Sequence, residues 1–482
     1  MKTITRREAL SGMGALAGVS ILSGCAVNPV TGKPEFMLMS ENREIRMGGE
    51  AHGQIKAQYG VYSDESIQQW FTDMGTSMAK ISHRKGLPWT FTVLDSPVIN
   101  AFAVPGGYIY VTRGILGYLN NEAQFAGVLG HELGHVNARH TAARYSKAQL
   151  ATLGIALGSI FSEEFAQFAD LASLGTSLLF LKFSRDNERQ ADSLGVEYSS
   201  KSNYDAVEIS EFFRTLERLR PKGGSLPTWQ STHPDPGDRI AATKKQALAF
   251  QKAHPDMKFR VRREEYLELI DGIIYGDDPR QGYVKDRVFY HPEMKFSFPV
   301  PAGWNVMNMP TEVRMSPEKQ DSLLIFTVTQ GTTPRDAAAA FNQENKVTVT
   351  TSKSLSINDR DAYKTMGQIP MNGQAAGISS HFITFGDKVF AFHGLCAPQM
   401  LTAMDTVFST TALGFGGIED PAFIDVSPKR LTVKTLEKTT TVRAALSSFG
   451  VGKDKLDEFA ILNGLGIDDQ IDAGRKLKVV ES

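Results

Sequence analysis

Residues 131–135 read His-Glu-Leu-Gly-His, inside a stretch (residues 122–140) whose apolar side chains recur with the period of a helix. Two histidines four positions apart project from one side of a helix. Both imidazoles can then reach a single Zn²⁺ at about 2.0 to 2.1 Å, and Glu132 falls beside the ion. We therefore expect His131 and His135 to bind the metal and Glu132 to act as a base on water. Because five residues can match by chance, their surroundings have to support this interpretation.

A second segment, residues 184–192, offers a carboxylate at the start of another helical stretch. Glu188 would complete a two-histidine, one-carboxylate site and leave a fourth position for water. Asp192, one turn later, would accept a hydrogen bond from the far nitrogen of a ligand histidine. The alternative is an exposed acidic helix face whose partners are Arg185 and Arg189.

These two segments together carry a family resemblance. Residues 131–140, His-Glu-Leu-Gly-His-Val-Asn-Ala-Arg-His, followed by Glu188-x-x-Ala191-Asp192, resemble the HtpX-like and CaaX-prenyl-protease-like zinc metallopeptidases, a gluzincin group. The resemblance covers approximately residues 40–250. It implies a mainly α, zincin-like protease domain with a small β-sheet, one Zn²⁺ per chain and endopeptidase activity. Since convincing spanning helices are absent after the first 25 residues, the chain resembles the exported, lipoprotein-type group that includes BepA and LoiP, without the helical repeats of the former.

The resemblance also implies roles for two further segments. Asn100, Ala101, Phe102 and Ala103 match the family's edge strand, to which an extended substrate would add. His233 and Arg239 are the implied donors to the oxygen that becomes charged during cleavage. His233 permits a second hypothesis, in which it displaces the water and keeps the enzyme inactive until its loop moves. A capping or packing histidine is the alternative for this position.

From these residues the sequence predicts a zinc-dependent endopeptidase that cleaves unfolded or misassembled envelope proteins. The competing interpretation is an envelope chaperone or assembly protein whose zinc site is structural. A peptidoglycan amidase is a third interpretation, which draws only on the C-terminal tail.

The first 25 residues predict export. Lys2, Arg6 and Arg7 form a basic start, and an apolar run at 9–22 is too short to span a bilayer permanently. The run ends in Leu-Ser-Gly-Cys, which looks like a lipobox and predicts that Cys25 is lipidated. An ordinary cleaved signal or an N-terminal anchor is the alternative. With alanine after the cysteine, we expect an outer-membrane lipoprotein that faces the periplasm.

Composition excludes some classes of partner and of stabilising bond. The 482 residues include 52 basic and 53 acidic side chains, which are scattered rather than clustered, so a nucleic-acid binder is not indicated. There are only two cysteines, and lipidation would use Cys25. Cys396 would then have no disulfide partner, and its apolar neighbours suggest a small buried hydrophobic side chain.

Four segments are expected along the chain: a lipoprotein signal peptide (1–25), the metallopeptidase domain (26–270), an α+β accessory domain (271–425) and a tail (426–482). Within the second we expect strands at 91–94 and 108–111. Two apolar stretches, 148–161 and 173–183, are expected as buried helices, with a membrane-facing surface as the alternative.

The last two segments resemble known modules less closely. In the accessory domain, Val300-Pro301-Ala302-Gly303-Trp304 faintly resembles PsbP-like domains, and no titratable cluster suggests chemistry there. The tail, with Leu-Asn-Gly-Leu at 462–465 and Gly-x-x-Leu-x-Val at 474–479, looks like a degenerate LysM module. In that family the module binds N-acetylglucosamine-containing glycans such as peptidoglycan. A small βα tail without a ligand is the alternative.

Overall fold

A computed structural model describes residues 25–152, 183–220, 229, 232–234, 237–371 and 374–481. The signal segment before Cys25 and most of the two apolar stretches, residues 153–161 and 173–182, lie outside the described residues. Contacts divide the chain into two compact units. The first unit contains the chain up to residue 276, apart from 57–59, together with residues 430–481, and the second contains residues 277–429. No helix in the described part of the chain is long and apolar enough to cross a membrane.

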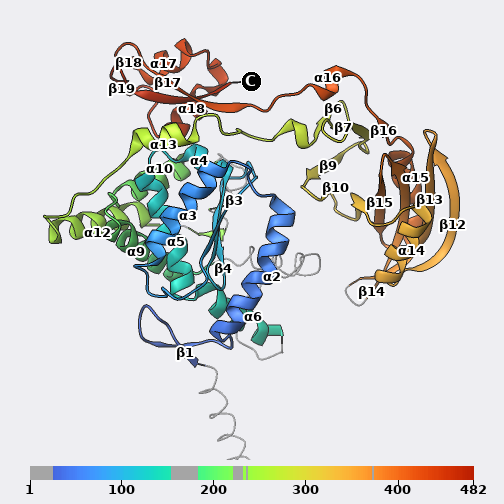
Figure 1. The fold of residues 1–482 in the computed structure, drawn as a ribbon, viewed down its shortest axis with the longest axis horizontal. Coiled ribbons are helices and arrows are strands. Elements are labelled where there is room, and N and C mark those ends of the chain that lie inside the picture. The colour runs from blue at the N-terminus through green and yellow to red at the C-terminus, as the bar shows by residue number, and fades with distance from the viewer. Residues whose placement is uncertain are drawn as a thin grey trace, which may run out of the picture. The chain divides into compact units, whose positions relative to one another are not determined.

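In the first unit, helices surround a three-stranded sheet of order β3-β5-β4 (Figure 1). β3 runs parallel to β5, and β4 pairs antiparallel with β5 at the edge. The two strands expected from the sequence are β3 and β5. The strands are β3 (Thr90–Leu94), β4 (Ala101–Val104) and β5 (Tyr108–Thr112), and the helices are α2 (Glu41–Tyr59), α3 (Glu65–Ala79), α4 (Arg113–Tyr118), α5 (Glu122–Asn137), α6 (His140–Thr152), α9 (Arg185–Lys201), α10 (Glu208–Arg218), α12 (Arg239–Ala253) and α13 (Arg263–Ile270).

Helix α5 lies at the centre of this unit. Asn121 caps its N-terminus by accepting a hydrogen bond from the backbone N–H of Gln124. Every residue of the helix is buried, so it is covered on all sides, although the sequence suggested a single apolar face. The two histidines of the motif are therefore held in the core rather than at the surface.

A short hairpin fixes the start of the described chain to this helix. β1 (Cys25–Val27) pairs with β2 (Pro34–Phe36). Asn28 follows β1, is fully buried, and donates its side-chain amide to the carbonyl oxygen of Ala138, 3.3 Å away at the end of α5. The chain is thus attached to the folded unit three residues after Cys25.

The second unit is built on a seven-stranded antiparallel sheet of order β12-β13-β14-β15-β11-β10-β9, with a smaller sheet of order β16-β8-β7-β6. Its strands are β6 (Tyr283–Lys285), β7 (Val288–His291), β8 (Phe296–Pro299), β9 (Trp304–Asn308), β10 (Glu312–Pro317), β11 (Ser322–Thr329), β12 (Thr348–Ile357), β13 (Arg360–Met371), β14 (Gln374–Phe385), β15 (Lys388–Cys396) and β16 (Gly416–Gly417). Its helical segments are η1 (Pro279–Gln281), α14 (Pro334–Glu344), η2 (Pro398–Met400), α15 (Leu401–Leu413) and α16 (Pro421–Ile424).

Side chains that alternate along the strands give the large sheet two packed faces. On β15, Val389 and Ala391 join the cluster that packs on α14, whereas Phe390 and Phe392 join the cluster that contains α15 and the small sheet. Cys396 is a free, buried cysteine, and burial raises the pKa of its thiol. It packs as a small apolar side chain, as the sequence suggested.

The C-terminal residues pack within the first unit. Their elements are β17 (Arg430–Thr435), β18 (Thr440–Thr441), α17 (Val442–Ser448), η3 (Lys453–Lys455), α18 (Leu456–Leu462), β19 (Gln470–Ile471) and β20 (Lys476–Glu481). β17 pairs antiparallel with β20. Lys478 is fully buried and donates to the carbonyl oxygens of Gly117 and Leu119, each 2.7 Å away at the end of α4. This contact attaches the C-terminal residues to the helical core.

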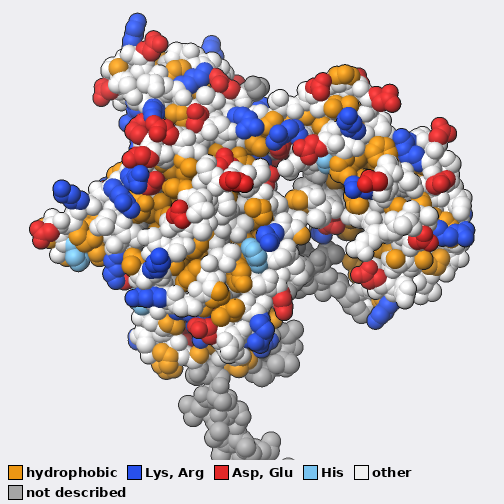
Figure 2. All heavy atoms as spheres, in the orientation of Figure 1, with side chains coloured by type: hydrophobic (Ala, Val, Ile, Leu, Met, Phe, Trp, Pro, Cys, Tyr) orange, Lys and Arg blue, Asp and Glu red, His pale blue; other side chains and the backbone are white. Residues whose placement is uncertain are grey.

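Charges on the surface are mixed in sign. Figure 2 shows lysines and arginines interspersed with acidic side chains over the visible face. This distribution agrees with the scattered charges of the sequence, and it offers no basic stripe on that face of the kind that nucleic acids require.

Candidate metal centre

Three glycines let α5 and α9 approach closely. A Cβ added to Gly130 would lie 2.9 Å from the carbonyl oxygen of Gly195, and one added to Gly134 would lie 3.2 Å from the Cα of Ala191. A Cβ on Gly195 would in turn lie 3.1 Å from the backbone nitrogen of His131. Because no side chains separate the helices here, residues of α9 can reach the histidines of α5.

The start of α9 places the acidic residues. Ser184 caps the helix by accepting from the backbone N–H of Asn187, and the side chain of Asn187 bonds back in a capping box. Glu188 therefore lies in the first turn, and Asp192 lies one turn further along. Glu188 is fully buried and Asp192 is 4% exposed, so neither is the exposed acidic face that was the alternative.

Four ligand groups converge at the contact between these helices: His131, His135, Glu188 and His233. His131 Nε2 lies 3.0 Å from His135 Nε2 and 3.2 Å from His233 Nδ1. Glu188 Oε1 lies 3.5 Å from His135 Nε2 and 3.2 Å from His233 Nδ1. Ligands at the corners of a tetrahedron around Zn²⁺ are about 3.3 Å apart. The cluster therefore fits a single zinc ion.

Polar atoms around the cluster lack partners of their own. Among the described residues, both carboxylate oxygens of Glu132 and the Oε2 atom of Glu188 are buried without a hydrogen bond. Burial raises the pKa of Glu132, and it lowers the pKa of His135 well below its usual value. Unpaired buried carboxylate oxygens are costly unless a cation or water satisfies them, so these residues suit a metal and its water.

Asp192 and Arg239 lie behind the cluster. Asp192 Oδ1 lies 2.9 Å from His131 Nδ1 and accepts a hydrogen bond of 2.6 Å from Arg239 Nη2. Burial alone would raise the pKa of Asp192, but Arg239 and His131 bring it below its usual range. The Nη2 atom of Arg239 is also 3.7 Å from Glu188 Oε2. Its guanidinium thus contacts the carboxylates of both Asp192 and Glu188 on α9.

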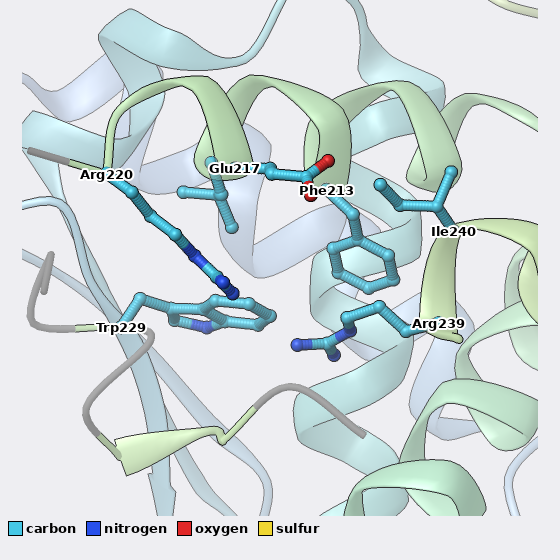
Figure 3. Close-up of a pocket in the computed structure, with 7 residues that line it drawn as sticks. Phe213, Glu217, Arg220, Trp229, Arg239 and Ile240 are labelled. Atoms are coloured by element: carbon cyan, nitrogen blue, oxygen red, sulfur yellow. The ribbon is translucent and has the colours of Figure 1, made fainter. Parts of the chain in front are cut away.

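Aromatic rings hold Arg239 and His233 in place. The guanidinium of Arg239 lies 3.8 Å from the ring centroid of Phe213 and 4.7 Å from that of Trp229 (Figure 3). Trp229 stacks on His233, with their centroids 4.8 Å apart and an interplanar angle of 19°. Phe213, Trp229 and Arg239 line a small pocket, whose other lining residues are Leu216, Glu217, Arg220 and Ile240. His233 Nε2 lies 3.7 Å from Glu132 Oε1.

The remaining predicted segment, residues 100–103, lies at the sheet edge. Ala101, Phe102 and Ala103 are in β4, and Asn100 directly precedes it. β4 pairs with β5 on one side only. The side-chain oxygen of Asn100 is buried and has no hydrogen-bond partner among the described residues.

Sequence reasoning missed three residues around the cluster: Trp229, His140 and Gln190. His140 Nδ1 lies 3.0 Å from His135 Nδ1, and His140 Nε2 lies 2.9 Å from Gln190 Oε1. His140 ends the quoted segment 131–140, but no role was predicted for it. Trp229 and Gln190 carry no comparable pattern.

Comparisons with known proteins agree with this geometry. The family model of Peptidase family M48 matches residues 65–247. The beta-barrel assembly-enhancing protease of Escherichia coli (strain K12) is 28% identical over 228 residues, 45% of this chain and 47% of that protein. The mitochondrial metalloendopeptidase OMA1 of Arabidopsis thaliana is 31% identical over 193 residues, 40% of this chain and 38% of that protein. The segment that resembles this family contains all four ligand groups of the cluster.

These matches cover part of each protein, since the chain spans about half the length of the curated relatives it matches. Among solved structures, cyanobacterial PsbP (CyanoP) from Synechocystis sp. PCC 6803 is 13% identical, with a TM-score of 0.24, over 27% of this chain and 91% of that chain. A TM-score this low does not establish a shared fold.

Proposed function

We propose that this chain is a zinc-dependent endopeptidase of the bacterial cell envelope that cleaves unfolded or misassembled proteins. One observation carries the proposal. Four buried ligand groups have the spacing of a tetrahedral zinc site, and beside them lies Glu132, whose carboxylate oxygens have no hydrogen-bond partner among the described residues. In this proposal His131, His135 and Glu188 hold the metal, and Asp192 orients His131.

Glu132 is the proposed general base. Zinc, when bound, would polarise the scissile carbonyl and lower the pKa of the attacking water. Glu132 takes the proton from this water and transfers it to the leaving amine. Burial raises its pKa, which makes the carboxylate a stronger base for the first step. No protein nucleophile is needed.

Substrate binding is proposed at the sheet edge. An extended peptide would add to β4 near Asn100, where backbone hydrogen bonds give affinity with little sequence preference. His233 and Arg239 are the candidate donors to the developing oxyanion. The contacts of Arg239 with Asp192 and Glu188 favour a positioning role for this residue.

The central experiment combines zinc analysis with one variant. We expect the purified lipid-free chain to hold one zinc per molecule and to cleave an unfolded protein. Glu132→Gln should keep its zinc and lose about 10² to 10⁴-fold in rate, because only the proton transfer is removed. Equal cleavage by the two proteins would contradict the catalytic assignment.

His233 supports a second hypothesis about regulation. Its Nδ1 atom takes the fourth corner of the ligand set, where the attacking water would have to bind. As a latch, His233 would keep the enzyme inactive until its segment moves. His233→Ala should then raise basal proteolysis, whereas a pure oxyanion donor predicts a lower rate. Unchanged activity would exclude both roles.

The alternative function is an envelope chaperone or assembly protein with a structural zinc site. The four-ligand set favours it, because structural sites are closed. Glu132 opposes it, since a purely structural site does not need a buried carboxylate that has no hydrogen bond among the described residues. Exchange of a zinc-coordinated water, measured by ¹⁷O relaxation on a paramagnetic Co²⁺-substituted protein, separates the two.

Lipidation of Cys25 is the proposed membrane attachment. The buried Asn28 is only three positions after Cys25, so at most about 11 Å of chain could lie between the lipid and this attachment to the folded unit. The enzyme would then be held at the membrane surface, proposed as the periplasmic face of the outer membrane. Incorporation of labelled palmitate that is lost in Cys25→Ser would support this attachment.

Peptidoglycan is the proposed ligand of the tail. The order strand, helix, helix, strand in residues 430–481, with β17 paired to β20, supports the likeness to LysM modules. Because Lys478 anchors these residues to α4, binding to purified sacculi should be measured on the full lipid-free chain. Absence of binding would leave the tail as a structural part of the first unit.

The second unit is proposed as a binding or spacer module.

A further inference from the structure

The two ligand histidines of α5 are supported from behind by different groups. His131 Nδ1 faces the carboxylate of Asp192. His135 Nδ1 instead faces the Nδ1 atom of another imidazole, His140, at 3.0 Å. The far nitrogen of that imidazole, Nε2, lies 2.9 Å from Gln190 Oε1. A carboxylate can only accept a hydrogen bond, whereas an imidazole nitrogen can accept or donate. The tautomer of His140 therefore has to be fixed for it to accept from His135.

The positions of the protons follow from the zinc site. His135 can bind a metal through Nε2 only if that atom carries no proton, so its Nδ1 must carry one. This N–H then donates to His140 Nδ1, which must be unprotonated. The proton of the neutral His140 is therefore on Nε2, where it needs an acceptor. Gln190 Oε1 is the atom that lies there.

The opposite arrangement would defeat metal binding. If Gln190 presented its NH₂ group, His140 Nε2 would accept and His140 Nδ1 would donate. His135 Nδ1 would then accept, and its proton would lie on Nε2, the atom that faces the metal. In the structure the Gln190 oxygen, rather than its NH₂ group, faces His140 Nε2, which is the orientation that metal binding requires. The oxygen and nitrogen of the amide are distinguished by this hydrogen-bond pattern.

The fold holds the relay rigidly. His140 begins α6 directly after Arg139, which adopts a left-handed φ of 59° and so turns the chain back towards α5. Arg139 Nη2 donates to the carbonyl oxygen of Met39, 2.6 Å away, and its guanidinium also pairs with Glu44. His140 is only 2% exposed, so water does not compete for its ring nitrogens.

We propose that His140 and Gln190 are positioning residues that hold His135 in the tautomer able to bind zinc. They would orient His135 as Asp192 orients His131, through two neutral hydrogen-bonded side chains instead of one carboxylate. This inference rests on the proposed zinc site. Outer groups of this kind typically contribute about 10- to 100-fold in metal affinity.

The test compares zinc affinity in paired variants by competition with a chromogenic chelator. Gln190→Met removes the acceptor and should weaken zinc binding about 10- to 100-fold. Gln190→Glu keeps an acceptor of the same shape and should bind at least as tightly as the parent chain. His140→Leu should weaken binding like Gln190→Met, and His254→Leu, at an exposed histidine of the same unit, should leave it unchanged.

A second measurement reports the histidine tautomers directly and does not depend on proteolytic activity. In ¹⁵N spectra of the metal-free protein, His135 should carry its proton on Nδ1 and His140 on Nε2, and Gln190→Met should mix the tautomers. If the parent chain binds no zinc, the proposed function fails. If it binds zinc and Gln190→Met binds equally well, or Gln190→Glu weakens binding as much as Gln190→Met, the relay alone is overturned.

Discussion

The metal cluster of the first unit and the cluster around Lys364 in the second unit differ in how their polar atoms are satisfied. In the first unit, the carboxylate oxygens of Glu132 have no hydrogen-bond partner among the described residues. In the second unit, Lys364 donates to Asp405 at 2.6 Å and to Ser409 at 2.9 Å, and Ser379 donates to the other oxygen of Asp405. The two charges are thus paired with each other, although Nδ1 of His381, whose ring contacts Ser409, has no hydrogen-bond partner among the described residues.

The difference separates a site from a structural network. Buried polar groups are normally hydrogen-bonded, so a cluster that leaves carboxylate oxygens unpaired points to a missing cation or water. A paired cluster needs no ligand. Lys364 and Ser409 lie within hydrogen-bond distance, as in a serine–lysine nucleophile, but Lys364 also forms an ion pair of 2.6 Å with Asp405.

Metal removal should give the largest effect and confine it to one unit. Zinc present at a thousand times its Kd stabilises the folded state by about 4 kcal/mol. Chelation should therefore speed hydrogen exchange in α5 and β3–β5 and leave β13–β15 unchanged. Hydrogen-exchange mass spectrometry of the full chain measures both. In Glu188→Gln, which lacks one metal ligand, the chelator should change hydrogen exchange less. An equal change of exchange in the two units would contradict the assignment of the metal site to the first unit alone.

The sequence predicts the first cluster much better than the second. Fixed spacing on one helix is visible in the sequence, and this made His131, Glu132 and His135 identifiable. Glu188 needed a second helix, whose approach depends on glycines such as Gly195 that have no distinctive pattern. The residues of the paired network come from strands and a helix that only the folded sheet brings together.

Domain organisation was predictable to a similar degree. The change from helical to strand-rich sequence near residue 280 marks the second unit, because the two periods differ. The packing of residues 430–481 with the first unit was not visible. It depends on Lys478, whose burial against two backbone carbonyls at the end of α4 follows no local rule.

Acid should weaken the second unit in a defined range of pH. Burial lowers the pKa of His393 to about 4, below its value of about 6.5 in an unfolded chain. The unfolded state therefore binds the proton first, and stability is lost as pH falls from 6.5 towards 4. At pH 4.5 this one histidine should cost about 2 to 3 kcal/mol.

The variant His393→Gln tests this origin. Glutamine keeps a polar group near Ser380, which lies 2.9 Å from His393 Nδ1, but cannot take up a proton in this range. Exchange in β14 and β15 should then depend less steeply on pH between 6.5 and 4.5 than in the parent chain. An unchanged slope would assign the acid sensitivity to other groups.

Breaking the paired network should have the smallest effect of the three. In Lys364→Met, Asp405 loses its cation but keeps the hydrogen bond from Ser379 and remains 21% exposed, so the cost should be about 2 kcal/mol. Peptide cleavage should not change, because the network has no part in the proposed chemistry. Lys353, exposed and directly opposite on β12, is the matched control, and Lys353→Met should change stability by less than about 0.5 kcal/mol. Denaturant unfolding followed by hydrogen exchange in β13 measures both variants. Loss of cleavage in Lys364→Met with zinc still bound would mean that the second cluster is a functional site after all.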